Sequence, residues 1–210
     1  MRNTPQSEPL DGSERSDEVL MAAYQNGEES ALAELVRRYA NLLLGYLTRM
    51  NLVQQQAEDV FQETFLRVHT KARSFRTEGR FKPWLFAIAT NLALDTLRRQ
   101  RRRPPPLSLD AEDAQHRSLM DRVPDRGPDP AEAAARADQR ARVRRALEAL
   151  PPRQRATVTL AYFEGLSYPE AAAALGCSVG TVKKQMSRAL RTLARLLPDA
   201  NPETIGGGAR

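Results

Sequence analysis

The chain has 210 residues with a formal net charge of +6; 28% of its residues are charged and 6% are aromatic. This length suits one large or two small domains, and the basic balance favours a polyanionic partner. One cysteine and two unpartnered histidines exclude a disulfide framework and a zinc site, so we expect no metal or other cofactor. The sequence contains no apolar run long enough to span a membrane and no signal-peptide pattern. We therefore expect a soluble, cytoplasmic protein.

Three helices are predicted after a polar lead at residues 1–15, whose composition is typical of disorder. The first is capped by Ser16 and ends at Gly27. The second runs from about Glu28 to Met50, and the third from about Gln54 to Arg73. Apolar residues recur every three or four positions in all three, so each helix is expected to bury one face.

The third helix carries an acidic and amide-bearing face opposite its apolar one. Glu58, Asp59, Gln62 and Glu63 form this face. A lone acidic face is usually just solvated, and a partner-binding face is the alternative. The residues by themselves leave both interpretations open.

A fourth helix is predicted after a turn at Gly79, with Pro83 in its first turn, where the missing N–H costs little. Asn91 and Asp95 lie one turn apart on an otherwise apolar helix. They are either buried and satisfied structurally or in contact with a ligand.

This helix ends in a run of arginines, and aromatic residues surround its start. The run is either a solvated helix end favoured by the helix dipole or a phosphate clamp beside a stacking surface. Cations and aromatics combined in this way hold single-stranded nucleic acid. The residues concerned are Phe75, Phe81, Trp84, Arg98, Arg99, Arg101, Arg102 and Arg103.

Residues 104–135 break the helical pattern. Prolines recur through this stretch, and seven acidic residues against three arginines give a net charge of −4. We interpret it as a flexible linker. Its 32 residues reach roughly 100 Å when extended, so two modules could contact well-separated parts of one partner.

A second module is expected at residues 136–197, followed by a flexible tail at 198–210. A short amphipathic helix precedes Pro151, and another closes at Gly165. A helix–turn–helix follows. Ser167 and Glu170 form a capping box for its first helix, which Gly176 ends.

The second helix of this pair is capped by Ser178 and has two distinct faces. Its apolar stripe consists of Val179, Val182, Met186, Leu190, Leu193 and Leu197. Opposite, within roughly 80°, lie Thr181, Lys184, Arg188, Arg191 and Arg195. This pattern suits the DNA major groove, and the alternative is an ordinary amphipathic helix. Cys177, in the turn, is most simply a small buried residue, with a redox switch as the alternative.

The chain from Asp17 to Leu197 resembles an extracytoplasmic-function (ECF, group IV) bacterial sigma factor of the sigma-70 family. AEDVFQETFLRV and FKPWLFAIATNLALDTLRR look like region 2 of the family. LEALPPRQRATVTLAYFEGLSYPEAAAALGCSVGTVKKQMSRAL looks like region 4. The two matches occur in the family's order, which makes the resemblance specific.

The resemblance implies roles for three groups of residues. It assigns core-polymerase binding to Asp59, Gln62 and Glu63, on the helix that binds the β′ clamp. The resemblance assigns recognition and melting of the minus-10 element to Phe75, Arg76, Arg80, Phe81, Trp84, Asn91, Asp95, Arg98 and Arg99. Contact with the minus-35 element falls to Ser178, Thr181, Lys183, Lys184, Ser187, Arg188 and Arg191.

The chain departs from the family pattern at two places. Lys184-Gln185 follows GTVK where many members have Ser-Arg, so a promoter sequence cannot be borrowed from relatives. The linker is also long and rich in proline.

The sequence therefore predicts an all-α protein of two small helical modules, regions 2 and 4, joined by a flexible linker. The resemblance implies a non-catalytic transcription initiation factor that binds core RNA polymerase, through the β′ clamp and the β flap, and promoter DNA. It also implies control by an anti-sigma factor. The alternatives are a stand-alone helix–turn–helix regulator, a structural RNA-binding protein and, more distantly, a nucleic-acid enzyme.

Overall fold

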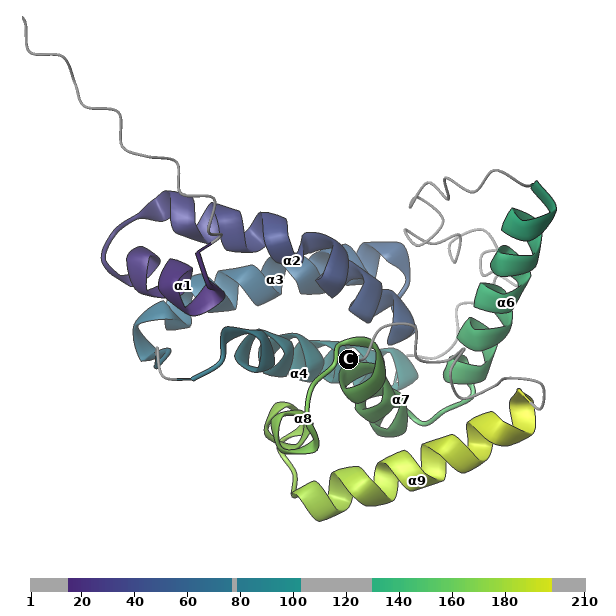
Figure 1. Ribbon diagram of the computed structural model, residues 1–210. Helices are drawn as coiled ribbons and strands as arrows, with labels where there is room; N and C mark the ends of the chain where they lie inside the picture. Colours follow the sequence, from purple (N-terminus) through teal and green to yellow (C-terminus); the bar gives the residue numbers. More distant parts are fainter. Residues whose placement is uncertain (1–14, 77–78, 103–129, 198–210) are drawn as a thin grey trace, which may run out of the picture.

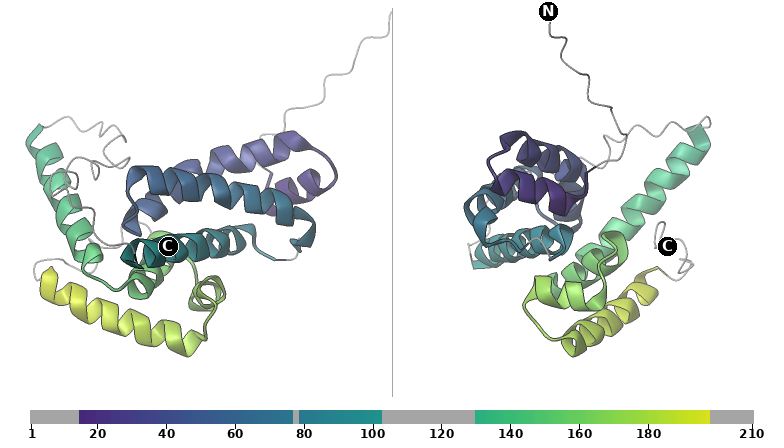
Figure 2. Two further views of the ribbon diagram at one scale, coloured as in Figure 1. Left: turned by 180° about the vertical axis from the view of Figure 1, so that it is seen from behind. Right: turned by 60° about the vertical axis from the view of Figure 1, so that its left-hand side comes forward.

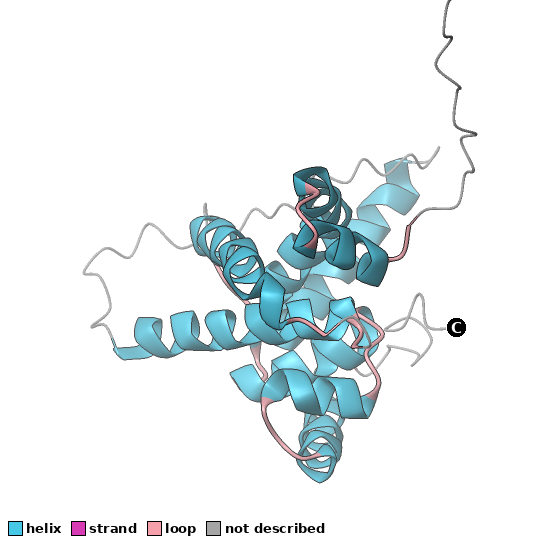
Figure 3. Ribbon diagram, turned by 90° about the vertical axis from the view of Figure 1, so that its left-hand side faces the viewer, coloured by secondary structure: helices cyan, strands magenta, loops and turns pink. Residues whose placement is uncertain are grey.

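The computed structural model describes residues 15–76, 79–102 and 130–197. Within these ranges the regular structure is helical and no strand occurs (Figure 3), which confirms the all-α prediction. Most of the predicted lead and linker, and the whole predicted tail, lie outside the described residues.

The first half of the chain folds into a bundle of the four predicted helices (Figure 1). These are α1 (Asp17–Gln25), α2 (Glu29–Arg49), α3 (Gln54–Lys71) and α4 (Phe81–Arg102), with a 3₁₀ turn, η1 (Ala72–Ser74), after α3. Ser16 caps α1 as predicted, because its side chain accepts a hydrogen bond from the Val19 amide.

Tyr46 lies at the centre of this bundle. Its ring is fully buried and meets Phe86 edge to face, with ring centroids 5.2 Å apart. Its hydroxyl shares a 2.7 Å hydrogen bond with Thr90, so the polar tip is satisfied inside the core. The contact joins the last turn of α2 to the first half of α4.

The second half consists of α6 (Pro130–Glu148), α7 (Pro152–Val158), a π turn η3 (Thr159–Phe163), α8 (Tyr168–Leu175) and α9 (Val179–Leu196). α6 begins at Pro130, before the predicted start of the second module at residue 136 and within the stretch predicted as linker. Proline is well suited to the first turn of a helix, and the residues after it are mostly Ala, Glu and Arg, which are strong helix formers.

The two halves pack directly against each other, although the linker pattern predicts separable modules. α8 packs across α4, and Figure 2 shows the second-half helices, green to yellow, beside the teal α4 of the first-half bundle. One apolar core spans the junction, with Ala171 and Ala172 of α8 in the same cluster as Leu92 and Ala93 of α4. The alanines of α8 allow this close approach because their side chains are small.

The second half also has a core of its own. It is formed by α6, α7 and α9, through Leu147, Val158, Met186 and Leu193 among others. The predicted apolar stripe of α9 is confirmed except at Leu190, which is 44% exposed. Ala189 is buried instead, because it lies closer to the centre of the stripe.

Candidate nucleic-acid and polymerase-binding surfaces

The helix–turn–helix formed by α8 and α9 is fixed by its caps. The Ser167 amide and hydroxyl donate to one carboxylate oxygen of Glu170 at 2.8 and 2.6 Å, and the Ser167 side chain accepts from the Glu170 amide. Gly176 ends α8 with φ +60°, a left-handed conformation that strains other residues. The predicted capping box and stop are both confirmed.

The start of α9 is held by two of the predicted minus-35 residues. The Ser178 side chain accepts from the Thr181 amide at 3.1 Å, and the two hydroxyls lie 2.9 Å apart. Ser178 therefore has a structural role as the helix cap. Thr181 is half-buried, so its hydroxyl is partly occupied by this cap.

The other predicted minus-35 residues are brought together on one exposed side of α9. They are Lys183, Lys184, Ser187, Arg188 and Arg191. Gln185, where the chain departs from the family pattern, is half-buried and lies 2.6 Å from the Thr157 hydroxyl of α7. At Gln185 the departure thus contributes to the contact between α7 and α9, whereas Lys184 lies on the exposed face.

The arginines of α9 also line a groove of about 650 Å³ beside the α6–α7 turn. Arg188, Arg191 and Arg195 form its cationic side, Pro151 belongs to the turn, and Gln154 belongs to the first turn of α7. The arginines lie one turn apart, and none has an ion pair among the described residues. Like charges at this spacing repel, so the surface is suited to an anionic ligand such as a phosphate backbone.

A second polar stripe runs along α4. Trp84, Asn91, Asp95 and Arg98 fall within about 60° of one another around the helix. Asn91 and Arg98 are exposed, whereas Trp84 is half-buried, and Arg98 donates to Asp95 at 2.9 Å. Arg99 is exposed on the flank of the stripe. Of the two interpretations of Asn91, the structure excludes a buried structural role.

The stacking surface predicted from Phe75 and Phe81 is wrong for this conformation, because both rings are buried, with 6% and 0% exposure. They pack with Trp84 in one aromatic cluster, in which the Phe75 and Trp84 centroids are 5.0 Å apart. Tyr39 of α2 closes the cluster from the other side, 5.5 Å from Phe81. Only Trp84 keeps a partly exposed ring.

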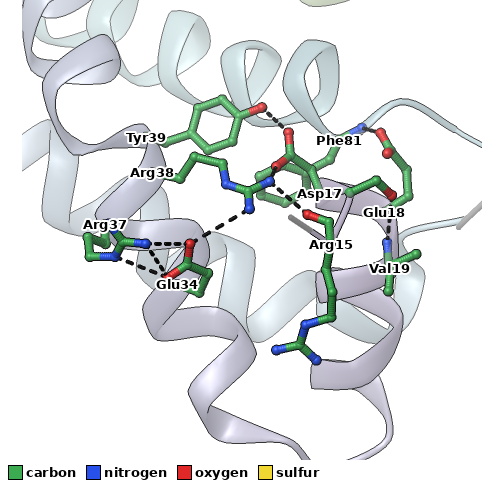
Figure 4. Close-up of polar contacts among 10 residues, drawn as sticks. Arg15, Asp17, Glu18, Val19, Glu34, Arg37, Arg38, Tyr39 and Phe81 are labelled. Carbon is green, nitrogen blue, oxygen red and sulfur yellow. Dashed lines mark hydrogen bonds and ion pairs between the residues drawn. The ribbon is translucent and has the colours of Figure 1, made fainter. Parts of the chain in front are cut away.

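A polar network fixes the start of α4 beside this cluster (Figure 4). Glu18 of α1 accepts a 3.0 Å hydrogen bond from the Phe81 amide, and this bond lowers the pKa of the Glu18 carboxyl. Asp17 accepts from Arg38 at 2.5 Å and from the Tyr39 hydroxyl. Burial raises the pKa of Tyr39 well above its ordinary value, so the hydroxyl remains a donor.

The acidic face of α3 is exposed at its centre. Asp59 and Gln62 are exposed, and Glu63 accepts a 2.8 Å hydrogen bond from Arg67. Leu66 lies on the same side, within about 100° of the other three around the helix, and is 56% exposed. Leu66 is absent from the residues predicted for this face. An apolar residue among polar ones on an exposed helix face is the signal that could have identified it.

The two remaining predicted minus-10 residues differ in their surroundings. Arg76 is exposed, after η1. Arg80 reaches across to the other half of the molecule and pairs with Glu170 of α8 at 2.8 Å. In this conformation Arg80 therefore contributes to the contact between α4 and α8.

The described part of the chain holds no group of His, Cys, Asp and Glu side chains suited to a metal ion. None of its helices combines the length and apolar character needed to cross a bilayer.

Comparisons with known proteins match both halves of the chain. Residues 35–103 match Sigma-70 region 2, and residues 140–193 match Sigma-70, region 4. The chain is 34% identical over 184 residues to the RNA polymerase sigma-H factor of Pseudomonas aeruginosa, covering 88% of this chain and 95% of that relative. It is 35% identical over 174 residues to the ECF RNA polymerase sigma-E factor of Haemophilus influenzae, covering 83% and 91%.

A solved structure, that of CnrH in complex with the cytosolic domain of CnrY, is also similar. It has a TM-score of 0.64 and 28% identity, and the match covers 89% of this chain and all of that one. The match to region 2 overturns the alternative of a stand-alone helix–turn–helix regulator, since such a protein would use only the second half of the chain.

Proposed function

The chain belongs to the ECF group of sigma-70 RNA polymerase sigma factors, and on this basis we propose which of its surfaces binds each partner. Sigma factors are transcription initiation factors and not enzymes. They bind core RNA polymerase and direct it to promoters. In this chain three exposed surfaces, on α3, α4 and α9, are available for that task.

The α3 face binds core polymerase. Asp59 and Gln62 are exposed there, and Leu66 offers an apolar anchor beside them. Interfaces draw much of their affinity from a few such apolar contacts, whereas polar neighbours set orientation and exclude competitors. The partner is the clamp of the β′ subunit, and the β flap contacts the second half of the chain.

The α4 and α9 surfaces bind promoter DNA. The stripe of Asn91, Asp95 and Arg98, with Trp84 at its start, contacts the minus-10 element, where an unpaired base needs both stacking and polar contacts. The exposed side of α9 enters the major groove of the minus-35 element, with Lys184 and Arg188 near its centre. The observation that carries the proposal is that both DNA-binding surfaces and the α3 face remain exposed.

Control comes from a protein partner. CnrH, which has a similar structure, was solved in complex with the cytosolic domain of CnrY. We extend this arrangement to the chain and expect an anti-sigma factor that keeps it from polymerase by covering the α3 face. The chain acts in the cytoplasm, where polymerase and promoters meet.

The experiment mixes the purified protein with sigma-free core RNA polymerase and a genomic promoter library, and the transcripts are sequenced. We expect discrete start sites with shared upstream elements, and their loss with either Asp59→Arg or Arg188→Ala. Asp138→Arg is the matched control, because Asp138 is exposed on α6, away from all three surfaces. If no start site depends on the protein, the proposal is wrong.

A further inference from the structure

Two polar side chains of α1 hold the chain on either side of the turn between α3 and α4. At the end of α1, Gln25 donates to the carbonyl oxygens of Ala72 and Phe75 at 2.8 and 2.9 Å. Near its start, Glu18 accepts a 3.0 Å hydrogen bond from the Phe81 amide (Figure 4). Glu18 and Gln25 lie two turns apart on one side of α1, about 10 Å along its axis. α1 therefore fixes both η1 and the first residue of α4.

The contact at Phe81 is a helix cap that another helix supplies. The first amide groups of a helix have no partner within it, and a negative charge beside them is favourable. Glu18 meets both needs of α4. The neighbouring Asp17 accepts from the Tyr39 hydroxyl, and the Tyr39 ring lies 5.5 Å from the Phe81 ring, measured between centroids. The backbone and the ring of Phe81 are thus both held through α1.

The backbone groups that Glu18 and Gln25 hold belong to the two buried rings behind Trp84. The centroids of Phe75 and Phe81 lie 5.0 and 6.0 Å from that of Trp84. Trp84 itself is half-buried, so part of its ring faces outward. Packed interiors leave little free volume, so a shift of either phenylalanine would change the position of the Trp84 ring.

α1 lies outside the part of the chain that matches a family model. The match to Sigma-70 region 2 begins at residue 35, whereas α1 ends at Gln25. The link between α1 and the exposed surface of α4 follows from the tertiary contacts alone.

We propose that Glu18 and Gln25 are positioning residues for promoter melting, which hold η1 and the start of α4 so that Trp84 is presented to an unpaired base. The inference rests on the proposed function, which assigns the minus-10 element to this surface of α4. Both residues act through Trp84 and do not touch the DNA. A surface that is ordered beforehand binds more tightly than one that must become ordered on binding.

Substitutions that hardly change the shape of the two side chains have opposite expected effects. Gln25→Glu removes both N–H donors and places a carboxylate against two carbonyl oxygens, so it should release η1. Glu18→Gln keeps an oxygen that accepts from the Phe81 amide, so it should preserve the cap. Glu18→Ala removes that acceptor altogether. We therefore expect melting to be impaired by Gln25→Glu and Glu18→Ala but not by Glu18→Gln.

The test uses holoenzyme assembled from core polymerase and the full chain. A fork-junction DNA, in which the minus-10 element has one unpaired strand, measures capture of the melted strand. We expect Gln25→Glu and Glu18→Ala each to raise the Kd for this DNA about tenfold, as for the loss of a hydrogen bond to a charged group. Promoter opening, followed by permanganate reactivity of unpaired thymines, should slow by a similar factor. The Kd for core polymerase and for a duplex that carries only the minus-35 element should not change.

Each impaired variant has a matched control. Asn26→Asp adds the same charge as Gln25→Glu at the end of α1, but Asn26 is exposed and its side chain does not hold η1. Glu28→Ala removes a carboxylate as Glu18→Ala does, but Glu28 pairs with Arg15 on the surface. Both controls should bind the fork-junction DNA as the wild type does.

Equal losses of affinity for core polymerase and for the fork-junction DNA would overturn the proposal. They would show that α1 only stabilises the bundle, which also carries the α3 face. Unchanged fork-junction binding by the impaired variants would overturn it as well. If Gln25→Glu does not fold, the comparison of Glu18→Ala with Glu18→Gln decides.

These outcomes are separable from a failure of the proposed function. If the wild-type holoenzyme neither binds the fork-junction DNA nor opens a promoter, the proposed function is wrong. If it does both and the variants of Glu18 and Gln25 match it, only this inference is wrong.

Discussion

The Arg155 guanidinium donates a 2.8 Å hydrogen bond to the Met50 carbonyl oxygen, 105 residues earlier in the chain. The same group donates to the carbonyl oxygens of Leu147, Glu148 and Leu150 at 2.8, 2.7 and 3.1 Å. One cation thus satisfies the ends of two helices, α2 and α6. Burial lowers the pKa of Arg155, in keeping with a charge that has been removed from water.

Arg155→Met should therefore destabilise the protein more than a surface substitution would. Four carbonyl oxygens are left without a charged donor, and we expect the unfolding free energy to fall by about 3–5 kcal/mol, as for other broken buried ionic contacts. Urea unfolding followed by circular dichroism measures this. Arg153→Met, at an exposed neighbouring position, should change it by less than about 0.5 kcal/mol. Equal effects would show that Arg155 has no such role.

The stability of the protein should depend on pH through Glu164. Burial raises the pKa of its carboxyl, and Arg49 and Lys82 offset only part of that rise. The folded state then binds a proton more tightly than the unfolded state does. Unfolding free energy should therefore decrease as pH rises from about 4.3, the ordinary glutamate value, through the raised value. Glu164→Gln should remove this slope in urea titrations at successive pH values, and an unchanged slope would contradict the prediction.

Leu66→Ser should weaken binding to core polymerase without unfolding the protein. Leu66 is 56% exposed, so the substitution removes little core packing, whereas an apolar interface anchor is typically worth more than about 1 kcal/mol. We expect the Kd for core polymerase to rise about tenfold, measured by fluorescence anisotropy. Leu42→Ser is a matched control, since Leu42 is 44% exposed but lies on α2. The prediction is wrong if both variants bind equally well.

Arg191→Ala should reduce DNA affinity by a similar factor for every sequence. Arg191 lines the groove beside the α6–α7 turn, which is suited to phosphates. The slope of log K against log salt should fall by about 0.9 for each phosphate that the variant no longer neutralises. Lys184→Ala, nearer the start of α9, should instead alter the sequence preference. Binding of holoenzyme to a promoter series at several salt concentrations distinguishes the two, and a sequence-dependent decrease with Arg191→Ala would refute the assignment.

Gly176→Ala should destabilise the helix–turn–helix even though there is room for a methyl group. No atom lies within 4 Å of the position that a Cβ would occupy, so the cost comes from the left-handed φ of +60°. That conformation costs about 1–2 kcal/mol for a residue with a Cβ. Thermal unfolding of the Gly176→Ala variant should show a lower Tm than that of the wild type. Ala173→Gly, at an exposed helix position, is the comparison, because it should lower the unfolding free energy by about 1 kcal/mol through helix propensity alone. A Tm of Gly176→Ala equal to that of the wild type would show that the left-handed backbone conformation carries no cost for alanine at this position.

The sequence by itself determined the local features of the chain. The caps at Ser16, Ser167 and Ser178 and the stop at Gly176 depend on residues within one turn of each other, and all four are confirmed. The two faces of α9 follow from helical periodicity, with Leu190 as the exception. Such features are predictable because the interacting groups are neighbours in the chain.

The tertiary structure alone decided which polar and aromatic residues become buried. Phe75 and Phe81 looked like a stacking surface, yet they fill the core, because Tyr39 from a distant helix completes their cluster. Arg49, Glu164 and Arg155 show no local pattern, and their partners across the junction lie about a hundred residues away. The packing of α8 on α4 likewise depends on shape complementarity between distant segments, which no helical period encodes.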